Sequence, residues 1–390
     1  MMPSAARVLV TVTVLALAYL TQRFWFLQTR RWVWLRWPSP QAARTHAVLF
    51  AAWMLGLILT GGHQAYRVDA FRWWVTVLYA IYFVGSFVAG LLLLFLRQGR
   101  RWLRSTPASA QTAFTPRRQF LRAATGALAA APFIASVYGF GRERLDFTVE
   151  HVQLHLGAAG SGLRGRTIAQ LSDIHISPFL NARDLRRAVD MVNELNADLI
   201  FLTGDFVTFK GESQYDCVRE LKRLRFRNPI LGCLGNHEIY THTEDSITRL
   251  LGQEGIEVLR TRSRLLHLGG TPLNVAGIDF LRVGEERTVD QLRPWLRTDS
   301  INVLLTHNPN AFDHVQDLPV DVCIAGHTHG GQLRVEFVEA DLTPARLMTP
   351  YVAGLYRRGA QQLYVNRGLG TIGVPIRLGA PPEITLYELA

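Results

Sequence analysis

The chain has 390 residues, 48% hydrophobic and 19% charged, a composition that excludes a disordered or collagen-like protein. Its three cysteines are too few and too widely spaced for a disulfide framework or a cysteine-rich zinc site. The net charge of +11 is unevenly divided: residues 1–144 carry 17 basic and 2 acidic side chains, whereas residues 145–390 carry 25 and 29. The basic character therefore belongs to the first third, and the rest of the chain shows no sign of a nucleic-acid partner.

Long apolar runs with few charges dominate the first third. Three of them, residues 5–22, 46–62 and 73–96, have about the length that crosses ~30 Å of hydrocarbon. A weaker, alanine-rich run at residues 123–140 is either a retained span or a signal-like segment that is cleaved. We expect residues 1–144 to form an α-helical membrane segment with three to four transmembrane helices. Buried helices of a soluble domain are the alternative.

Arginines set the expected orientation of this segment. The loops at residues 23–44 and 97–118 each carry five or more arginines, and such loops stay in the cytoplasm. Residues beyond about 141 are then extracytoplasmic. The pattern TPRRQFL, with Arg117 and Arg118, resembles a twin-arginine export signal, although an ordinary positively charged flank gives a similar pattern.

Residues 145–390 alternate short apolar runs with amphipathic stretches, a pattern typical of a mostly parallel sheet covered by helices. Strands are predicted at residues 167–171, 198–202, 230–234, 275–278, 302–305 and 322–325, and helices at residues 182–195, 215–224 and 245–251. Three later segments, 332–337, 362–365 and 383–387, have the pattern of antiparallel strands. The expected fold is an α/β domain, a two-sheet β sandwich flanked by helices.

Five of these strands end in polar residues of one chemical kind. The five blocks are Ser172–His175 (SDIH), Thr203–Asp205 (TGD), Gly235–Glu238 (GNHE), Thr306–Asn308 (THN) and Gly326–His329 (GHTH). Ligands of α/β sheets bind beyond the carboxyl ends of the strands, so we expect the five blocks to meet at one rim. Carboxylate, amide and imidazole ligands without thiols suit Zn, Mn or Fe.

With these five blocks in order, the chain resembles the calcineurin-like metallophosphoesterase superfamily over about residues 166–390. The GHTHGGQ block at residues 326–332 and the tail at residues 364–370 are similar to its membrane-associated bacterial branch. That branch includes exported phosphodiesterases and enzymes that cleave UDP-diacylglucosamine. The resemblance implies a metal-dependent hydrolase in a bacterial inner membrane, and the arginine distribution predicts that its catalytic domain lies outside the cytoplasm.

The resemblance also assigns roles to the strand-end residues, around two divalent metal ions. The ligand positions of the family fall on seven residues: Asp173, His175 and His329 for a first metal, Asn236, His307 and His327 for a second, and Asp205 as the bridge. His237 falls on the position of a catalytic residue that stabilises the transition state or protonates the leaving group. Arg357, Arg358 and Arg367 are further candidates for contact with a phosphate, with a solvated surface position as the alternative.

Together these features predict a membrane-tethered phosphoesterase, a phosphodiesterase rather than a monoesterase. It would hydrolyse a lipid-linked or envelope phosphodiester by attack of a metal-activated hydroxide. One alternative is a pyrophosphatase of the UDP-diacylglucosamine type on the cytoplasmic face, which the arginine distribution disfavours. The other is a non-catalytic membrane signalling protein that binds metal or phosphate, which the complete ligand set with His237 disfavours.

Overall fold

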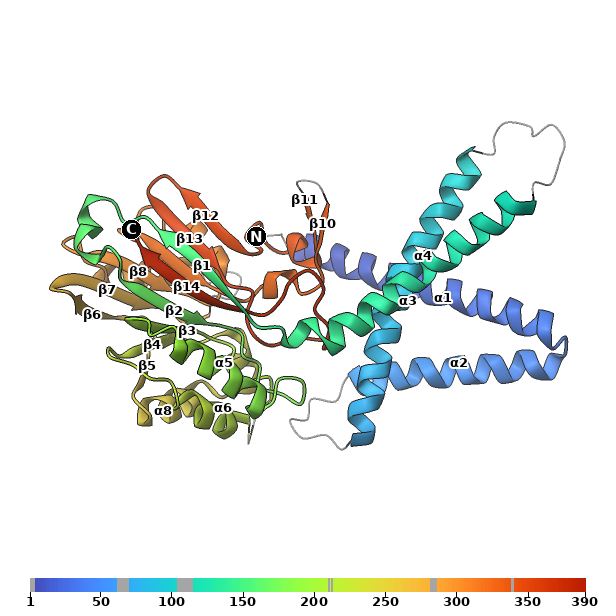
Figure 1. Cartoon of the computed structure of the whole chain (residues 1–390), viewed down its shortest axis with the longest axis horizontal. Helices are drawn as coiled ribbons and strands as arrows, with labels where there is room; N and C mark the ends of the chain where they lie inside the picture. The colour runs from blue at the N-terminus through green and yellow to red at the C-terminus, as the bar shows by residue number, and fades with distance from the viewer. Residues whose placement is uncertain are drawn as a thin grey trace. The chain divides into compact units, whose positions relative to one another are not determined.

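The computed structural model describes residues 4–61, 70–103, 115–209, 211, 213–280, 286–337 and 340–390 (Figure 1). The described chain divides into two compact units, and the division falls between Gly141 and Arg142. The first unit is helical, and the second contains all the strands. The division lies three residues before the boundary expected from the sequence, at residue 144.

The first unit consists of long helices. Their bounds are α1 (Ser4–Arg36), α2 (Pro40–Gly61), α3 (Ala70–Leu103) and α4 (Thr115–Gly141). A buried polar contact joins α1 to α3, because the Gln22 side chain donates to Ser86 Oγ at 2.9 Å. The Trp25 indole donates to the carbonyl oxygen of Ser86 at 2.7 Å. These bonds satisfy polar groups that lie between otherwise apolar helix surfaces.

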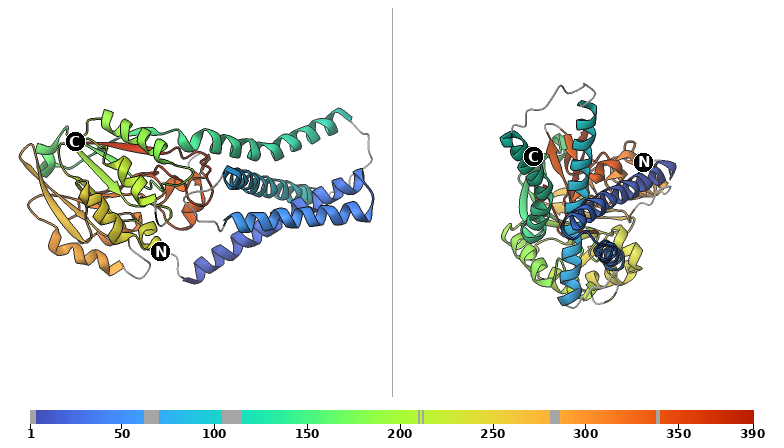
Figure 2. Two further views of the ribbon diagram at one scale, coloured as in Figure 1. Left: turned by 90° about the horizontal axis from the view of Figure 1, so that it is seen from below. Right: turned by 90° about the vertical axis from the view of Figure 1, so that its right-hand side faces the viewer.

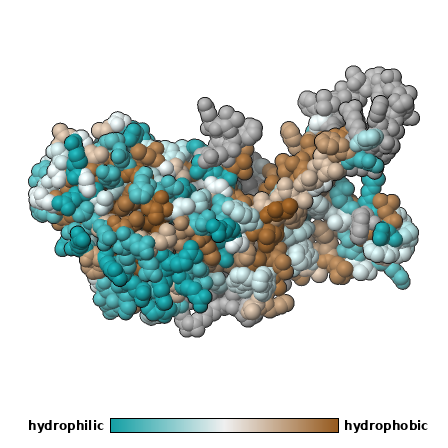
Figure 3. Space-filling view, viewed as in Figure 1, coloured by the Kyte–Doolittle hydropathy of each residue, from teal (hydrophilic) through white to brown (hydrophobic). Residues whose placement is uncertain are grey.

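Two stretches are long and apolar enough to cross a membrane: Ala70–Gly99 lies in this unit, and Gln119–Leu145 starts in it and ends at the beginning of the second unit. They contain the expected runs at residues 73–96 and 123–140. Large apolar side chains are exposed along both, including Phe95 at 79% and Ile134 at 69%, and much of this unit's surface is apolar in Figure 3. Length and composition therefore support two spans.

The other two expected runs, residues 5–22 and 46–62, fall on α1 and α2. Residue 62 and several side chains in both runs lie outside the described part of the chain, so these two spans stay predictions. The expected arginine-rich loop at residues 97–118 is shorter than predicted: α3 continues to Leu103 and α4 begins at Thr115, so five of its six arginines fall on these helices. Residues 104–114 lie outside the described part of the chain.

The second unit is built on two six-stranded sheets. The first has the order β1 (Thr148–Leu154), β14 (Glu383–Leu389), β2 (Thr167–Leu171), β3 (Leu199–Thr203), β4 (Ile230–Cys233), β5 (Ile256–Val258). The second has the order β12 (Gly354–Arg358), β13 (Gln361–Val365), β9 (Val322–Ala325), β8 (Ile301–Leu305), β7 (Thr271–Gly277), β6 (Arg262–Leu268). A separate hairpin pairs β10 (Val335–Phe337) with β11 (Ala340–Leu342).

Both sheets are mixed, which corrects the expectation of simply antiparallel late strands. β14 pairs antiparallel with β2 but parallel with β1, and β13 pairs antiparallel with β12 but parallel with β9. Residues 332–334 belong to no strand, and β10 pairs only within its hairpin. The central strands β2 to β4 and β7 to β9 are parallel, as the sequence predicts.

Helices cover the outer faces of the sandwich (Figures 1 and 2). The α-helices are α5 (Ala182–Glu194), α6 (Ser213–Leu221), α7 (Asn236–Thr241) and α8 (Glu244–Gln253). The 3-10 helices are η1 (Glu143–Leu145), η2 (Ala158–Leu163), η3 (Glu286–Trp295), η4 (Pro309–His314), η5 (His329–Gly331) and η6 (Pro344–Leu347). The expected two-sheet sandwich with flanking helices is confirmed.

The strand β3 shows why apolar and polar residues do not alternate along the central strands. Phe201 packs in the core between the two sheets, with side chains such as Val303. Its neighbours Ile200 and Leu202 point the other way and pack in the core beneath α5, with Val189. Both faces of the strand are thus buried, so every position favours an apolar side chain. Polar residues appear only where the strand ends, and the site is built there.

Candidate metal centre

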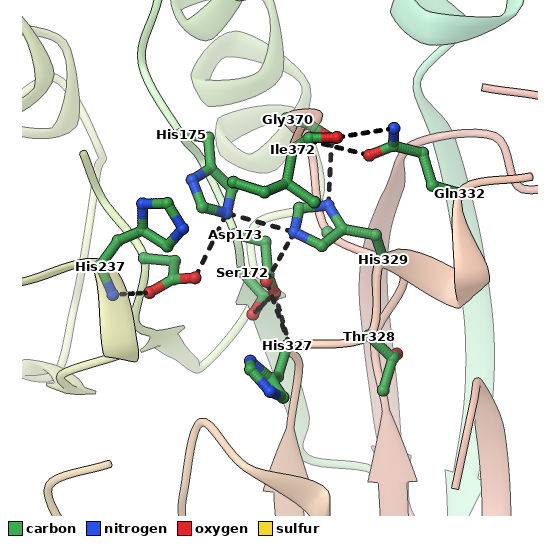
Figure 4. A network of polar contacts seen from close by, with 12 residues as sticks. Ser172, Asp173, His175, His237, His327, Thr328, His329, Gln332, Gly370 and Ile372 are labelled. Carbon is green, nitrogen blue, oxygen red and sulfur yellow. Dashed lines mark hydrogen bonds and ion pairs between the residues drawn. The ribbon is translucent and has the colours of Figure 1, made fainter. Parts of the chain in front are cut away.

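The five loops beyond β2, β3, β4, β8 and β9 bring seven of the eight predicted site residues to one end of the sandwich, and the eighth, Asn236, is buried directly before His237. Figure 4 shows five of them: Asp173, His175, His237, His327 and His329. Three overlapping groups of side chains have potential ligand atoms within 4.8 Å of one another. Their members are Asp173, His175 and His329; His175, Asp205 and His237; Asp205, His307 and His327. The convergence expected from the sequence is therefore present in the structure.

Asp173, His175 and His329 form the first group. His329 Nε2 lies 3.3 Å from Asp173 Oδ1 and 3.2 Å from His175 Nε2. Asp173 is fully buried, and its carboxylate also accepts the backbone N–H of His327 at 3.0 Å. The hydroxyl of Ser172 donates to the same carboxylate at 2.5 Å. These two donors hold the carboxylate facing the imidazoles.

Asp205, His307 and His327 form the group on the other side, and Asp205 contacts both groups. Asp205 Oδ2 lies 3.1 Å from His307 Nε2 and 3.2 Å from His175 Nε2. The other oxygen, Oδ1, accepts the backbone N–H of His237 at 2.8 Å. His307 Nδ1 lies 2.7 Å from the Thr203 carbonyl oxygen, which fixes the ring so that Nε2 faces the carboxylate.

One buried ligand atom tests whether this arrangement fits a metal. Asn236 Oδ1 has no hydrogen-bond partner within the described residues. A buried polar atom without a partner costs about 1–3 kcal/mol. A divalent cation would satisfy this oxygen, and imidazole, amide and carboxylate are ligands that Zn, Mn and Fe accept. The residues present therefore fit metal ions.

The electrostatics of the site favour the metal-binding forms of two histidines. Burial lowers the pKa of His327 to about 3, and the charge of His307 acts in the same direction. Burial also holds the pKa of His329 well below its usual range, with further contributions from His175 and Arg377. Both imidazoles are therefore neutral at pH 7, the form that binds a metal.

His307 behaves differently because it faces two carboxylates. Burial lowers its pKa, but the charges of Asp205 and Asp173 outweigh burial and raise the pKa to about 10. Without a cation, His307 is therefore protonated and paired with Asp205. A metal ion bound between them would take the place of that proton.

The backbone of the site is held in conformations that are rare for ordinary residues. Nine described non-glycine residues have positive φ, and five belong to the predicted site: Asp173, His175, Asp205, His327 and His329. Such residues cluster at functional sites, because the surrounding structure must hold them there at a cost of about 1–3 kcal/mol each. The left-handed turns point these side chains inward from the strand ends.

Two glycines allow the ligand loops to approach each other. A Cβ atom on Gly235 would lie 2.1 Å from Asp205 Oδ1, and one on Gly326 would lie 2.2 Å from Asp173 Oδ2. Both distances are too short for any side chain. The glycines of the GNHE and GHTH blocks are thus required because carboxylates of neighbouring loops pack directly against them.

Glu238 organises two of the loops, a role that sequence reasoning missed. Its fully buried carboxylate accepts the backbone N–H groups of Gly235 at 2.8 Å, Asp205 at 3.0 Å, Phe206 at 2.8 Å and Val207 at 3.3 Å. It therefore ties the start of α7 to the loop that presents Asp205. The capping-box pattern, a Glu three residues after the N-cap, is the signal that could have revealed this role.

His237 lies close to the ligands without the same contacts. Its ring packs edge-on against His175, with centroids 4.5 Å apart, and the residue is half-buried. Burial lowers its pKa to about 4, and the charge of His175 acts in the same direction. His237 is therefore neutral at pH 7 and suited to donating a hydrogen bond beside His175 and Asp205.

Two of the three candidate phosphate-binding arginines have carboxylate partners instead. Arg358 pairs with Asp313 at 2.6 Å, and Arg367 pairs with Glu150 at 2.6 Å and with Glu383 at 3.2 Å. Since both guanidinium groups are already neutralised, the structure does not favour them as phosphate ligands.

Known proteins with similar sequences agree with this geometry. A family model described as Calcineurin-like phosphoesterase matches residues 166–331. The metallophosphoesterase YkuE of Bacillus subtilis is 33% identical over 70% of this chain and 97% of its own length. The chain belongs to the calcineurin-like phosphoesterase family. Its membership confirms the resemblance drawn from the five strand-end blocks.

Two further relatives extend the comparison. A "Transmembrane protein with metallophosphoesterase domain" of Danio rerio is 30% identical over 88% of this chain and 79% of its own length. "Phosphodiesterase YaeI" of Escherichia coli is 29% identical over 70% of this chain and 98% of its own length. Family membership and the ligand groups together support a phosphoester hydrolase with divalent metals.

The different roles of His237 and His329 lead to a first prediction. His237→Ala should leave the bound metal near the wild-type amount while lowering turnover by about 10²- to 10⁴-fold, the usual contribution of a positioned proton donor. His329→Ala, which removes a predicted ligand, should lose metal. Metal analysis of both purified variants beside their rates is the measurement. Loss of metal from His237→Ala would show that His237 is itself a ligand.

The four backbone bonds of Glu238 lead to a second prediction. Glu238→Gln replaces an acceptor oxygen by an N–H₂ group that faces backbone donors, so the free energy of unfolding should fall by about 2–4 kcal/mol. Glu254→Gln is the matched control, because Glu254 makes only an exposed ion pair with Lys222 and should change stability by less than about 1 kcal/mol. Equal urea midpoints for both variants would rule out the organising role.

Proposed function

We propose that this protein is a membrane-tethered phosphodiesterase with two divalent metal ions, acting outside the cytoplasm on a lipid-linked or envelope phosphodiester. The observation that carries the proposal is the position of Asp205 between two groups of buried histidines. The relative named as a phosphodiesterase supports the reaction class. Mn, Zn or Fe are the metals that the ligands suit best.

The site residues would have two kinds of role, metal binding and hydrogen bonding to the substrate. The first metal would be held by Asp173, His175 and His329, the second by Asn236, His307 and His327, and Asp205 would bridge the two. When bound, two such ions polarise phosphate oxygens and make a water nucleophilic near neutral pH. His237, neutral and half-buried beside the bridge, donates a hydrogen bond to the phosphoryl oxygen that gains charge in the transition state.

Membrane tethering is supported by the two candidate spans and by the relative named as a transmembrane protein. The second candidate span, Gln119–Leu145, continues directly into the second unit, which begins at Arg142. An enzyme tethered in this way meets membrane substrates at a high effective concentration. The tether therefore favours a substrate that lies in or on the same membrane.

An exposed apolar surface beside the site supports a lipid-linked substrate. Its side chains, here called the hairpin surface, are Val335, Leu342, Leu347, Met348 and Ile372, exposed by 60%, 62%, 44%, 72% and 39%. Val335 and Leu342 are direct cross-strand partners. Ile372 is bound through its backbone to Gln332, which follows η5 and therefore His329. Grouped apolar side chains of this kind mark interaction sites for proteins or membranes.

Extracytoplasmic orientation is supported by the arginines, which gather at residues 23–44 and 97–118, on either side of two expected spans. Arg117 and Arg118 fall in the first turn of α4, where an export signal of the twin-arginine type would place them. Both observations favour a domain that lies outside.

The hairpin surface leads to a prediction about substrate preference. Full-length protein with Mn²⁺ should hydrolyse both a chromogenic diester and a phospholipid diester in vesicles. In a Leu342→Ser, Met348→Ser variant the rate on vesicles relative to the chromogenic diester should fall about tenfold, because two apolar contacts with lipid are lost.

Tyr215→Ser is the control, because Tyr215 is equally exposed but lies on α6. That variant should keep the wild-type ratio. An unchanged ratio in the double variant would argue against a lipid substrate. Absence of hydrolysis of either diester by metal-loaded wild type would contradict the phosphodiesterase itself.

The arginine distribution leads to a prediction about sidedness. Alkaline phosphatase fused after Ala390 should be active, and a cytoplasmic reporter at the same position should be inactive, because arginine-rich loops resist translocation. Changing Arg117 and Arg118 to Lys should reduce phosphatase activity if the twin-arginine route is used. The reverse reporter pattern would overturn the orientation and favour the cytoplasmic-face pyrophosphatase.

A further inference from the structure

Arg377 is a fully buried arginine that lies outside the five strand-end blocks. Its guanidinium donates to the carbonyl oxygens of Gly370 (2.5 Å from Nη2 and 3.1 Å from Nε), Ala380 (2.8 Å), Arg367 (2.9 Å), Gly368 (3.0 Å) and His329 (3.4 Å). One side chain therefore binds the backbone of a whole loop, residues 367–370, together with the backbone of a predicted metal ligand.

The loop that Arg377 holds packs directly on the turn that carries two other ligands. The backbone N–H of Gly370 donates to the Asp173 carbonyl at 2.7 Å, and that of Leu369 donates to the Ser172 carbonyl at 3.0 Å. A Cβ atom on Gly370 would lie 2.7 Å from the Cβ of His175. The loop thus supports the turn between Asp173 and His175 from behind.

The Gly370 carbonyl oxygen also faces His329. It lies 3.3 Å from His329 Nδ1 (Figure 4). The same oxygen accepts two bonds from Arg377. When Nδ1–H donates to this oxygen, the lone pair of Nε2 is free on the side where Nε2 meets Asp173 and His175. Arg377 Nη2 also lies 3.5 Å from Nδ1, but the Gly370 carbonyl oxygen is nearer and can only accept, so it favours the tautomer of His329 that binds a metal.

Stability alone does not account for a buried charge at this position. All its hydrogen-bond partners above are neutral carbonyl groups. The carboxylates of Asp173, Glu383 and Glu143 favour its charge, but none forms an ion pair with it among the described residues, and a charge that is not paired directly is expensive to bury. An apolar side chain of similar volume would fill the same space with less desolvation. A role in arranging the loop accounts for the guanidinium, whose five N–H donors reach several carbonyls at once.

We propose that Arg377 is a positioning residue of the metal centre, one that holds the carbonyls of residues 367–370 so that Asp173, His175 and His329 keep the geometry for the first metal. This inference rests on the proposed pair of metals. It makes a specific demand: loss of Arg377 should weaken the first metal position and spare the second, whose residues the guanidinium does not contact.

The test isolates each metal position in the full-length protein. In a His327→Ala background the first position should remain, and in a His329→Ala background the second. Mn²⁺ affinity is measured by EPR titration. Adding Arg377→Met should weaken this affinity about 10- to 100-fold in the His327→Ala background. In the His329→Ala background the affinity should change by less than about twofold. Arg377→Lys keeps the charge but has fewer N–H donors, so its Mn²⁺ affinity in the His327→Ala background should lie between those with Arg377 and with Arg377→Met.

Arg186→Met is the matched control, because Arg186 pairs with Glu220 between α5 and α6 and should alter neither titration. Equal weakening in both backgrounds, or in neither, would overturn the positioning role. If wild type bound no metal at all, the proposed function would fail instead.

A measurement on the unsubstituted protein covers the case in which Arg377→Met does not fold. Nitrogen-15 NMR of labelled histidine, with His329 assigned by comparison with His329→Gln, reports its tautomer in the metal-free protein. The proposal requires the proton on Nδ1. A proton on Nε2 would contradict it even if every variant were unstable.

Discussion

The Asp205 carboxylate lies between two histidines that come from different sheets, His175 beyond β2 and His307 beyond β8. One oxygen atom can contact both only if the ends of the two sheets stay a fixed distance apart. That distance is set by the side chains between the sheets, including Phe201 and Val303. The packing of the sandwich thus determines whether the site exists.

Polar side chains beneath the ligands then fix the loops, which have little regular structure of their own. The Glu238 carboxylate gathers backbone N–H groups on the Asp205 side, and the Arg377 guanidinium gathers backbone carbonyls on the His329 side. Their chemistry is complementary: an anion collects donors and a cation collects acceptors. Each satisfies backbone groups that strained turns leave unpaired by the sheets. Metal ions would then stabilise the folded state further, because they bind it in preference to the unfolded chain.

The sequence predicts the central strands well, and it predicts that the polar blocks behind them meet at one end of the sandwich, because both features depend on local patterns. Apolar runs such as residues 199–203 are covered on both faces, and a polar block directly follows each run. Strand pairs that are distant in sequence cannot be predicted in this way. No local pattern shows that β14 lies between β1 and β2, because strand order is decided by packing of the whole sheet.

Arg377 was not predictable for the same reason. In a chain with 42 basic residues a single arginine carries no signal, and the three arginines first considered for phosphate contact were other ones. Its role depends on carbonyl groups that only the folded loop brings together. A sequence pattern does not show which backbone groups the fold brings together. Residues that position the ligands are therefore harder to predict than the ligands themselves.

Crystals of the manganese-loaded protein offer the most direct test of the central claim, that Asp205 bridges two metals. Anomalous scattering should show two peaks about 3.5–4 Å apart, with the Asp205 carboxylate between them and the histidines divided as described. A single peak, or two peaks that share no Asp205 oxygen, would contradict the account.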